Sequence, residues 1–160
     1  MQGYSSAEHG VGHVLPRAGG SILVEDGGTL VVRACDIIGN GLGADGYGAA
    51  YMGGGVQLAG HGTQGDFYNC TFTNWVATYA AAFYSTGGHP DSPLVSRFFG
   101  CSFVRNRPLV SGSLTIGWED VDAAFYDCLF EDNINHALMI WESAPTDHPK
   151  VVVERCVRAF

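Results

Sequence analysis

Short stretches of alternating apolar and polar residues recur along the chain, each containing a cysteine. In one of them, Asn69 and Thr71 separate the apolar Tyr68, Cys70 and Phe72. Alternation with a period of two is typical of a strand that buries one face, so the cysteine side is predicted to face the core. Two further stretches repeat this pattern, with Phe99, Cys101 and Phe103 in one and Tyr126, Cys128 and Phe130 in the other.

The cysteines recur at intervals of 35, 31, 27 and 28 residues, and they are Cys35, Cys70, Cys101, Cys128 and Cys156. A second apolar stretch recurs between them, at residues 56–58, 79–84, 113–116 and 137–141. An internal period of this size indicates stacked repeats. No stretch shows a sustained helical period with caps, and a β-sandwich would need a turn signal every 8–12 residues or so. We therefore predict an all-β fold, a right-handed parallel β-helix (solenoid) of about five coils.

Stacking of equivalent strands in parallel predicts ladders of like side chains along the core. One ladder would hold the five cysteines, and a second would hold Phe72, Phe103 and Phe130. An asparagine follows four of the strands; asparagine tolerates the left-handed conformation and bonds to nearby backbone, so it suits the corner that ends each strand. These asparagines are Asn40, Asn74, Asn106 and Asn133.

The outermost repeats depart from this pattern. Arg33 occupies the position of Tyr68, and Glu154 and Arg158 flank Cys156 on the predicted inward face. The final residues, VERCVRAF, stop in the middle of a repeat. We expect residues 1–160 to form one β-helix domain that is a fragment of a longer solenoid. Adjacent coils of a longer chain, or self-association, would then cover its ends.

Composition narrows the classes of partner. The chain is 46% hydrophobic and 15% charged, which suits a packed core, and its net charge of −8 disfavours a nucleic-acid partner. No apolar run is long enough for a transmembrane segment. Five cysteines cannot all form disulfides with one another, and no zinc-binding spacing is present, so we expect buried free thiols.

Acidic residues and histidines gather in the loops that precede the cysteine strands. Asp26, His61, Glu119 and Asp147 each stand nine residues before a cysteine, so stacking in register would line them along one edge. Such an edge can bind Ca²⁺ through carboxylates, bind a sugar or hold an acid/base pair, and the plain alternative is a solvated loop edge. The complete candidate edge is Asp26, His61, Asp66, His89, Asp91, Glu119, Asp120, Asp122, Asp147 and His148.

Two short motifs resemble a known repeat family. The segments Phe103-Val-Arg-Asn106 and Phe130-Glu-Asp-Asn133 resemble the FxxN element of polymorphic outer membrane proteins. Gly54-Gly55-Val56 and Gly19-Gly20-Ser21-Ile22 resemble the companion element of that family, two glycines before a small or aliphatic residue. The resemblance implies a β-helix of the surface-protein or pectate-lyase-like kind, at an extracellular or cell-surface location. It implies no particular activity.

Three interpretations of function stay open at this point. The first is a structural or carbohydrate-contacting module, to which the residues assign no catalysis; its partner would be a polysaccharide or another glycan. Trp75, Trp118 and Trp141 are candidates for stacking on sugar rings. The second is a polysaccharide lyase or glycoside hydrolase acting from the loop edge, which needs clustered carboxylates. The third is an adhesin-like surface repeat.

Overall fold

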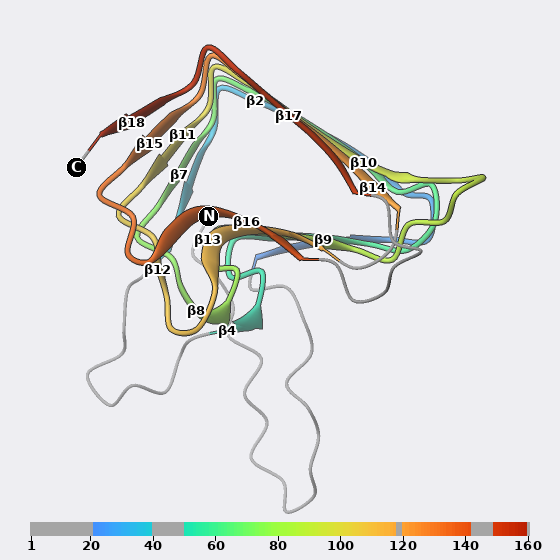
Figure 1. Ribbon diagram of the computed structural model, residues 1–160, viewed down its shortest axis with the longest axis horizontal. Coiled ribbons are helices and arrows are strands. Elements are labelled where there is room, and N and C mark those ends of the chain that lie inside the picture. The colour runs from blue at the N-terminus through green and yellow to red at the C-terminus, as the bar shows by residue number, and fades with distance from the viewer. Residues whose placement is uncertain (1–20, 40–49, 118–119, 142–148, 160) are drawn as a thin grey trace, which may run out of the picture.

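The computed structural model describes residues 21–39, 50–117, 120–141 and 149–159, and only the backbone of residues 50–52. These residues form strands and turns and contain no helix. Viewed down the stack of coils, the strands of successive coils overlie one another along the sides of a triangle (Figure 1). The cysteine repeats thus wind around a common core.

The two longest sides of the triangle are sheets A and B. Sheet A has the spatial order β1 (Ile22–Glu25), β5 (Val56–Ala59), β9 (Phe83–Thr86), β13 (Gly112–Gly117) and β16 (His136–Trp141). Sheet B has the order β17 (Lys150–Glu154), β14 (Val121–Tyr126), β10 (Leu94–Phe99), β6 (Gln64–Tyr68) and β2 (Thr29–Arg33).

Sheets C and D complete each circuit. Sheet C has the order β18 (Val157–Ala159), β15 (Leu129–Glu131), β11 (Ser102–Val104), β7 (Thr71–Thr73) and β3 (Asp36–Ile38). Sheet D has the order β12 (Arg107–Pro108), β8 (Val76–Tyr79) and β4 (Ala50–Met52). Each of these pairings is parallel, as between β6 and β10 or β11 and β15. The structure therefore confirms an all-β parallel solenoid.

The number of complete coils is smaller than the sequence predicted. Only three of the described coils contribute a strand to all four sheets, because sheet D ends at β12. The two coils that follow contribute strands to sheets A, B and C. The solenoid thus has about three complete turns rather than five.

The inward face of sheet B is the opposite of the one predicted. Phe67, Phe98 and Phe125 are fully buried, whereas the neighbouring Tyr68 is only partly buried. Asn69 adopts a left-handed conformation with φ of 51°, which makes a corner between β6 and β7. A single residue in that conformation breaks the alternation, so Tyr68 points outward although Cys70 and Phe72 point inward. The same correction applies to Phe99, Tyr126 and Glu154, which share the register of Tyr68.

Two columns of phenylalanine form the centre of the core. In sheet B the ring of Phe98 stacks on those of Phe67 and Phe125, with centroids 4.9 Å and 4.8 Å away. In sheet C the ring of Phe103 stacks on those of Phe72 and Phe130, at 4.9 Å and 5.2 Å. The rings of the two columns meet edge to face, as Phe98 and Phe103 do at 5.5 Å. Aromatic packing therefore joins sheets B and C through the three middle coils, from β6 and β7 to β14 and β15.

The cysteines complete the corner between sheets B and C. The residue before each one is left-handed, and these residues are Ala34, Asn69, Gly100, Asp127 and Arg155. Each thiol lies within hydrogen-bonding reach of the carbonyl oxygen two residues earlier, as Cys70 Sγ does at 3.3 Å from Tyr68 O. Cys70 Sγ also contacts Val32 O of the preceding coil, at 3.6 Å. The five thiols are free, and Cys70, Cys101 and Cys128 are buried.

Burial of the thiols predicts a loss of stability in alkaline solution. Desolvation raises the pKa of Cys101 from 9.0 to about 11 and that of Cys128 to about 12. The unfolded thiols ionise near pH 9, so the stability from protonated thiols is complete below that pH and is lost between about pH 9 and 12. We expect the melting temperature to fall less steeply in this window for a Cys101→Ala/Cys128→Ala variant than for the parent chain. Equal slopes of melting temperature against pH would contradict this expectation.

The predicted corner asparagines have two different roles. Asn74 is left-handed, with φ of 58°, and is exposed. The residues equivalent to Asn74 in the next two coils are Arg105 and Asp132, and both are left-handed. Asn106 and Asn133 come one residue later and do not adopt that conformation. They therefore lack the left-handed conformation, but their side chains bond to nearby backbone, as expected of corner asparagines. Asn40 lies outside the described residues. Asn106 is buried, and its side chain is bonded to the backbone of the preceding coil, at Trp75 and Phe72.

Candidate functional site

Part of the predicted loop edge comes together between sheets A and B. Asp26 follows β1, and Gly60 and Gly87 occupy the same place after β5 and β9. The imidazole rings of His61 and His89 lie with their centroids 5.2 Å apart. A shallow depression of about 510 Å³ is lined by Asp26, Gly60, His61 and Gly87. Stacking thus brings one carboxylate and two imidazoles to the same edge.

Two other acids of the candidate edge lie on the outer face of sheet B. The carboxylate of Asp66, in β6, accepts two hydrogen bonds from the Arg97 guanidinium, at 2.6 Å and 3.0 Å. This hydrogen bonding raises the pKa of Arg97. Asp122, in β14, lies 3.9 Å from the ammonium group of Lys150. Both carboxylates already have a cationic neighbour, so they are parts of ion pairs between coils.

Asp91 and Asp120 make backbone contacts with the loop that carries His89. The backbone N–H of Asp91 donates to Nδ1 of His89 at 3.3 Å, and the carbonyl of Asp120 accepts from the N–H of Leu94 at 3.1 Å. Glu119, Asp147 and His148 lie outside the described residues. Within the described part of the chain, no three or more His, Cys, Asp or Glu side chains form a group that could hold a metal ion. Calcium binding stays a prediction.

A groove on the outer side of sheet A is the more defined site. It has a volume of about 240 Å³ and is lined by Tyr79, Val110, Ser111, Met139, Ile140 and Trp141. Tyr79 ends β8, residues 110–111 lead into β13, and the other three residues belong to β16. Trp141 is 38% exposed, and its ring centroid lies 6.2 Å from that of Tyr79 at an interplanar angle of 48°. Two aromatic rings thus stand at an angle in an apolar groove.

The surface beside this groove is also apolar. Val110 is 59% exposed and Leu109 is 58% exposed, although both follow directly on the buried Pro108. The hydroxyl of Ser111 is buried and is bonded to the N–H of Ala80 at 2.9 Å and to Thr115 Oγ1 at 3.3 Å. The Ser111 hydroxyl is therefore used in hydrogen bonds within the protein, and a ligand in the groove would contact mainly apolar and aromatic side chains.

The sequence identified only one residue of this groove. Of the three tryptophans, Trp141 is exposed, Trp75 is buried with its indole N–H donating to Ile37 O at 2.8 Å, and Trp118 lies outside the described residues. The groove depends on the segment from β12 to β13, which lies on the outer side of sheet A. The available sequence signal for it was the apolar pair Leu109-Val110 directly after a proline.

A second aromatic row lies on the outside of sheet B. The rings of Tyr68, Phe99 and Tyr126 are stacked, with centroids 4.9 Å and 5.3 Å apart, and the Arg33 guanidinium lies 4.0 Å from the Tyr68 centroid. Phe99 has a ring on each of its faces, and Tyr68 lies between Phe99 and the Arg33 guanidinium. This row stabilises the stack of coils.

Comparison with protein-family models, with curated proteins and with solved structures finds no match for this chain. Within the described residues, no helix has the length and apolar character needed to cross a membrane. A functional proposal therefore has to come from the geometry of the site.

Proposed function

We propose that this chain is a β-solenoid module that contacts carbohydrate through the groove between Tyr79 and Trp141. The single observation that supports this is the pair of angled aromatic rings in an apolar groove on the outside of a stable stack. Aromatic rings bind the apolar C–H face of a pyranose. Sites for drug-sized ligands span roughly 300–1,000 Å³, so a groove of about 240 Å³ suits one sugar ring.

Charge indicates the kind of carbohydrate. The chain has a net charge of −8, and the described residues that line the groove carry no charge. An acidic polysaccharide would be repelled by the protein as a whole and would find no cation in the groove. The preferred ligand is therefore a neutral glycan, bound through one exposed ring of the polymer.

A binding experiment tests this proposal. Neutral oligosaccharides of several linkages are titrated into the chain while intrinsic tryptophan fluorescence is followed, with calorimetry as the second readout. We expect Trp141→Ala to weaken binding by about tenfold, because it removes one stacking partner. The matched control is Tyr126→Ala, which removes an aromatic ring from the outside of sheet B, away from the groove, and should leave binding unchanged.

Two results would contradict the proposal. The first is the absence of binding to every neutral glycan tested. The second is binding that Trp141→Ala and Tyr126→Ala weaken equally. The lyase or hydrolase alternative stays a prediction, and so does the adhesin-like one. No described cluster of unpaired carboxylates favours catalysis over binding, since Asp66 and Asp122 each have a cationic neighbour.

A further inference from the structure

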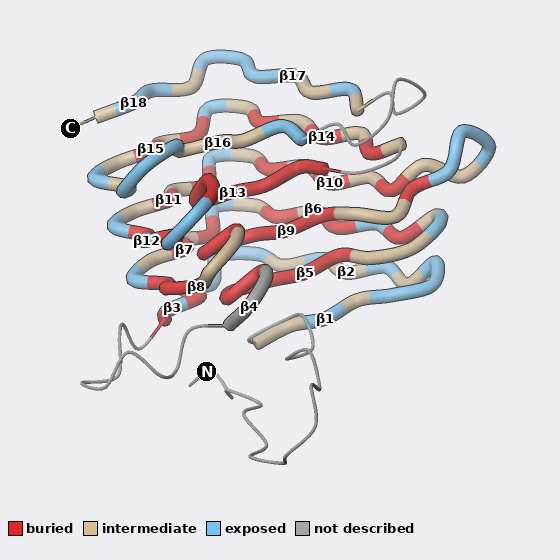
Figure 2. The backbone as a smooth tube through the Cα atoms, turned by 60° about the horizontal axis from the view of Figure 1, so that its bottom comes forward, coloured by how far each residue is buried: buried red, intermediate tan, exposed pale blue. Residues whose placement is uncertain are grey.

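The coil made by β16, β17 and β18 exposes side chains that other coils bury. Val153 has the same register in sheet B as Phe125, yet it is 51% exposed and Phe125 is fully buried. Cys156, which follows β17, is only partly buried, whereas Cys128 of the preceding coil is buried. The burial map shows the same contrast between this coil and the middle coils (Figure 2). The described structure thus presents an open apolar end with three strand edges.

The direction of the backbone groups in β17 is fixed by its pairing with β14. The carbonyl of Glu154 accepts a hydrogen bond from the N–H of Asp127 at 3.0 Å, so Glu154 directs its backbone groups toward the preceding coil. Because these directions alternate along a strand, Lys150 and Val152 do the same. Val151 and Val153 direct their N–H and C=O groups toward the open edge, where another strand can pair with them.

The sequence of β17 is complementary to itself in the antiparallel direction. It reads Lys-Val-Val-Val-Glu, with the central Val152 flanked by valines and then by opposite charges. If a second copy is placed antiparallel about a two-fold axis at Val152, Val151 faces Val153 of the second copy. That pair uses the backbone groups that point to the open edge, so both of its hydrogen bonds can form.

The same arrangement matches the charges. Lys150 of each copy then lies directly opposite Glu154 of the other, and both residues are on the outer face of the sheet, where directly opposed charges interact. A register shifted by two residues in either direction keeps the hydrogen bonding but loses the pairing of Lys150 with Glu154. Charge therefore selects one register out of those that the backbone allows.

We propose that a second copy of this chain covers the open end, through antiparallel pairing of β17 with β17 about a two-fold axis at Val152. Such an interface is isologous, so it closes into a dimer and does not continue into a fibre. It also gives the edge strands of sheet B a partner, which removes an exposed template for aggregation.

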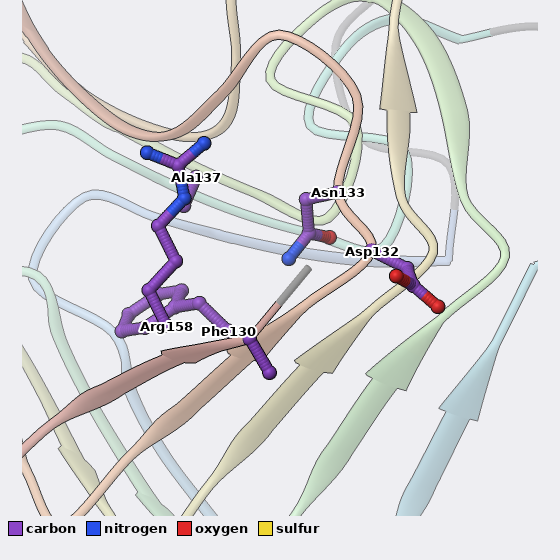
Figure 3. A pocket seen from close by; sticks show the side chains of 6 residues that line it. Phe130, Asp132, Asn133, Ala137 and Arg158 are labelled. Atoms are coloured by element: carbon purple, nitrogen blue, oxygen red, sulfur yellow. The ribbon is translucent and has the colours of Figure 1, made fainter.

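A pocket lies at the same end of the stack. It has a volume of about 280 Å³ and is lined by Phe130, Asp132, Asn133, Ala137, Arg158 and Ala159 (Figure 3). Arg158 stands in the register of Phe130, so a cation occupies the end of an apolar column. Asp132 also lines the pocket, and its carboxylate is directed away from Arg158 (Figure 3). Each copy therefore brings one cation and one anion to this end.

Sedimentation velocity on the 160-residue chain, over a series of concentrations, tests the proposal. We expect an equilibrium between monomer and dimer. Glu154→Lys places a lysine of each copy opposite Lys150 of the other copy, so like charges face each other at two places in the interface. The substitution should raise the dimer dissociation constant by about tenfold. The double variant Lys150→Glu/Glu154→Lys restores opposite charges in the same register and should restore dimerisation. Asp91→Lys makes a charge reversal in an exposed loop and should leave the dissociation constant unchanged.

Several outcomes would overturn the inference. These are a chain that stays monomeric at every concentration, open polymers that grow with concentration, and a dimer that Glu154→Lys does not weaken. Circular dichroism of each variant shows whether it folds. Because only complementary charge explains rescue by the second substitution, a failure to rescue in a folded double variant also counts against this interface.

Discussion

Replacing Phe98 by alanine is expected to lower the free energy of unfolding by about 3–5 kcal/mol. The ring of Phe98 is fully buried at the centre of the stack. It stacks on Phe67 and Phe125 and meets Phe72, Phe83 and Phe103 at its edges, with centroids between 4.8 and 6.1 Å away. Since neighbouring coils fix the positions of these rings, the cavity cannot close. Chemical denaturation followed by circular dichroism measures the loss.

The matched control for this substitution is Phe99→Ala, one residue further along. Phe99 stacks on Tyr68 and Tyr126, but on the solvent side of sheet B, and it is only partly buried. Its removal should lower the free energy of unfolding by about 1 kcal/mol, which is the usual contribution of an aromatic contact at a half-exposed site. A larger loss for Phe99→Ala than for Phe98→Ala would mean that the faces of β10 are assigned the wrong way round.

Substitution of Asn106 by alanine should lower the free energy of unfolding by about 3 kcal/mol or more. Its Oδ1 accepts from the backbone N–H of Trp75 at 3.1 Å, and its Nδ2 donates to the carbonyl of Phe72 at 3.0 Å. Nδ2 also donates to Oδ1 of Asn133 at 3.1 Å. Alanine would leave two buried backbone groups without partners, and each such group costs about 1–3 kcal/mol.

Asn74→Gly is the control for Asn106→Ala. Asn74 is exposed and left-handed, and glycine keeps that backbone conformation without strain. Its effect on the free energy of unfolding should lie within about 0.5 kcal/mol, as for an ordinary surface substitution. Comparable losses for the two variants would show that Asn106 contributes as a corner residue and not through its hydrogen bonds between coils.

The sequence was sufficient to predict the stacking but not the inward face of every strand. The cysteine interval and the alternation around Cys70 and Phe72 predicted parallel strands with a buried cysteine side, as the structure shows. In sheet B two aromatic residues stand side by side, as Phe98 and Phe99 do, so hydrophobicity alone does not say which one points inward. Which of the two points inward depends on the left-handed residue at the following corner, here Gly100 with φ of 60°. That backbone angle is known only once the chain is folded.

The candidate edge was harder to predict, because it depends on loops of unequal length. The shared spacing of nine residues before a cysteine correctly predicted that Asp26 and His61 lie at one edge. The same spacing does not predict the direction in which a side chain points. Asp66 and Asp122 belong to strands and pair with the next coil. The groove beside Trp141 arises from residues of β8, β16 and the segment before β13, which no local pattern connects.

Successive repeats stack in parallel, in the register that creates both the groove and the open end. Scalar couplings across hydrogen bonds, measured by NMR on isotope-labelled protein, test this stacking. Parallel stacking predicts a coupling from the N–H of Asn69 to the carbonyl of Phe99 and one from the N–H of Gly100 to the carbonyl of Tyr126, across bonds of 2.8 Å and 2.9 Å. Couplings that instead join β6 to β7 or β10 to β11 as antiparallel hairpins would contradict it.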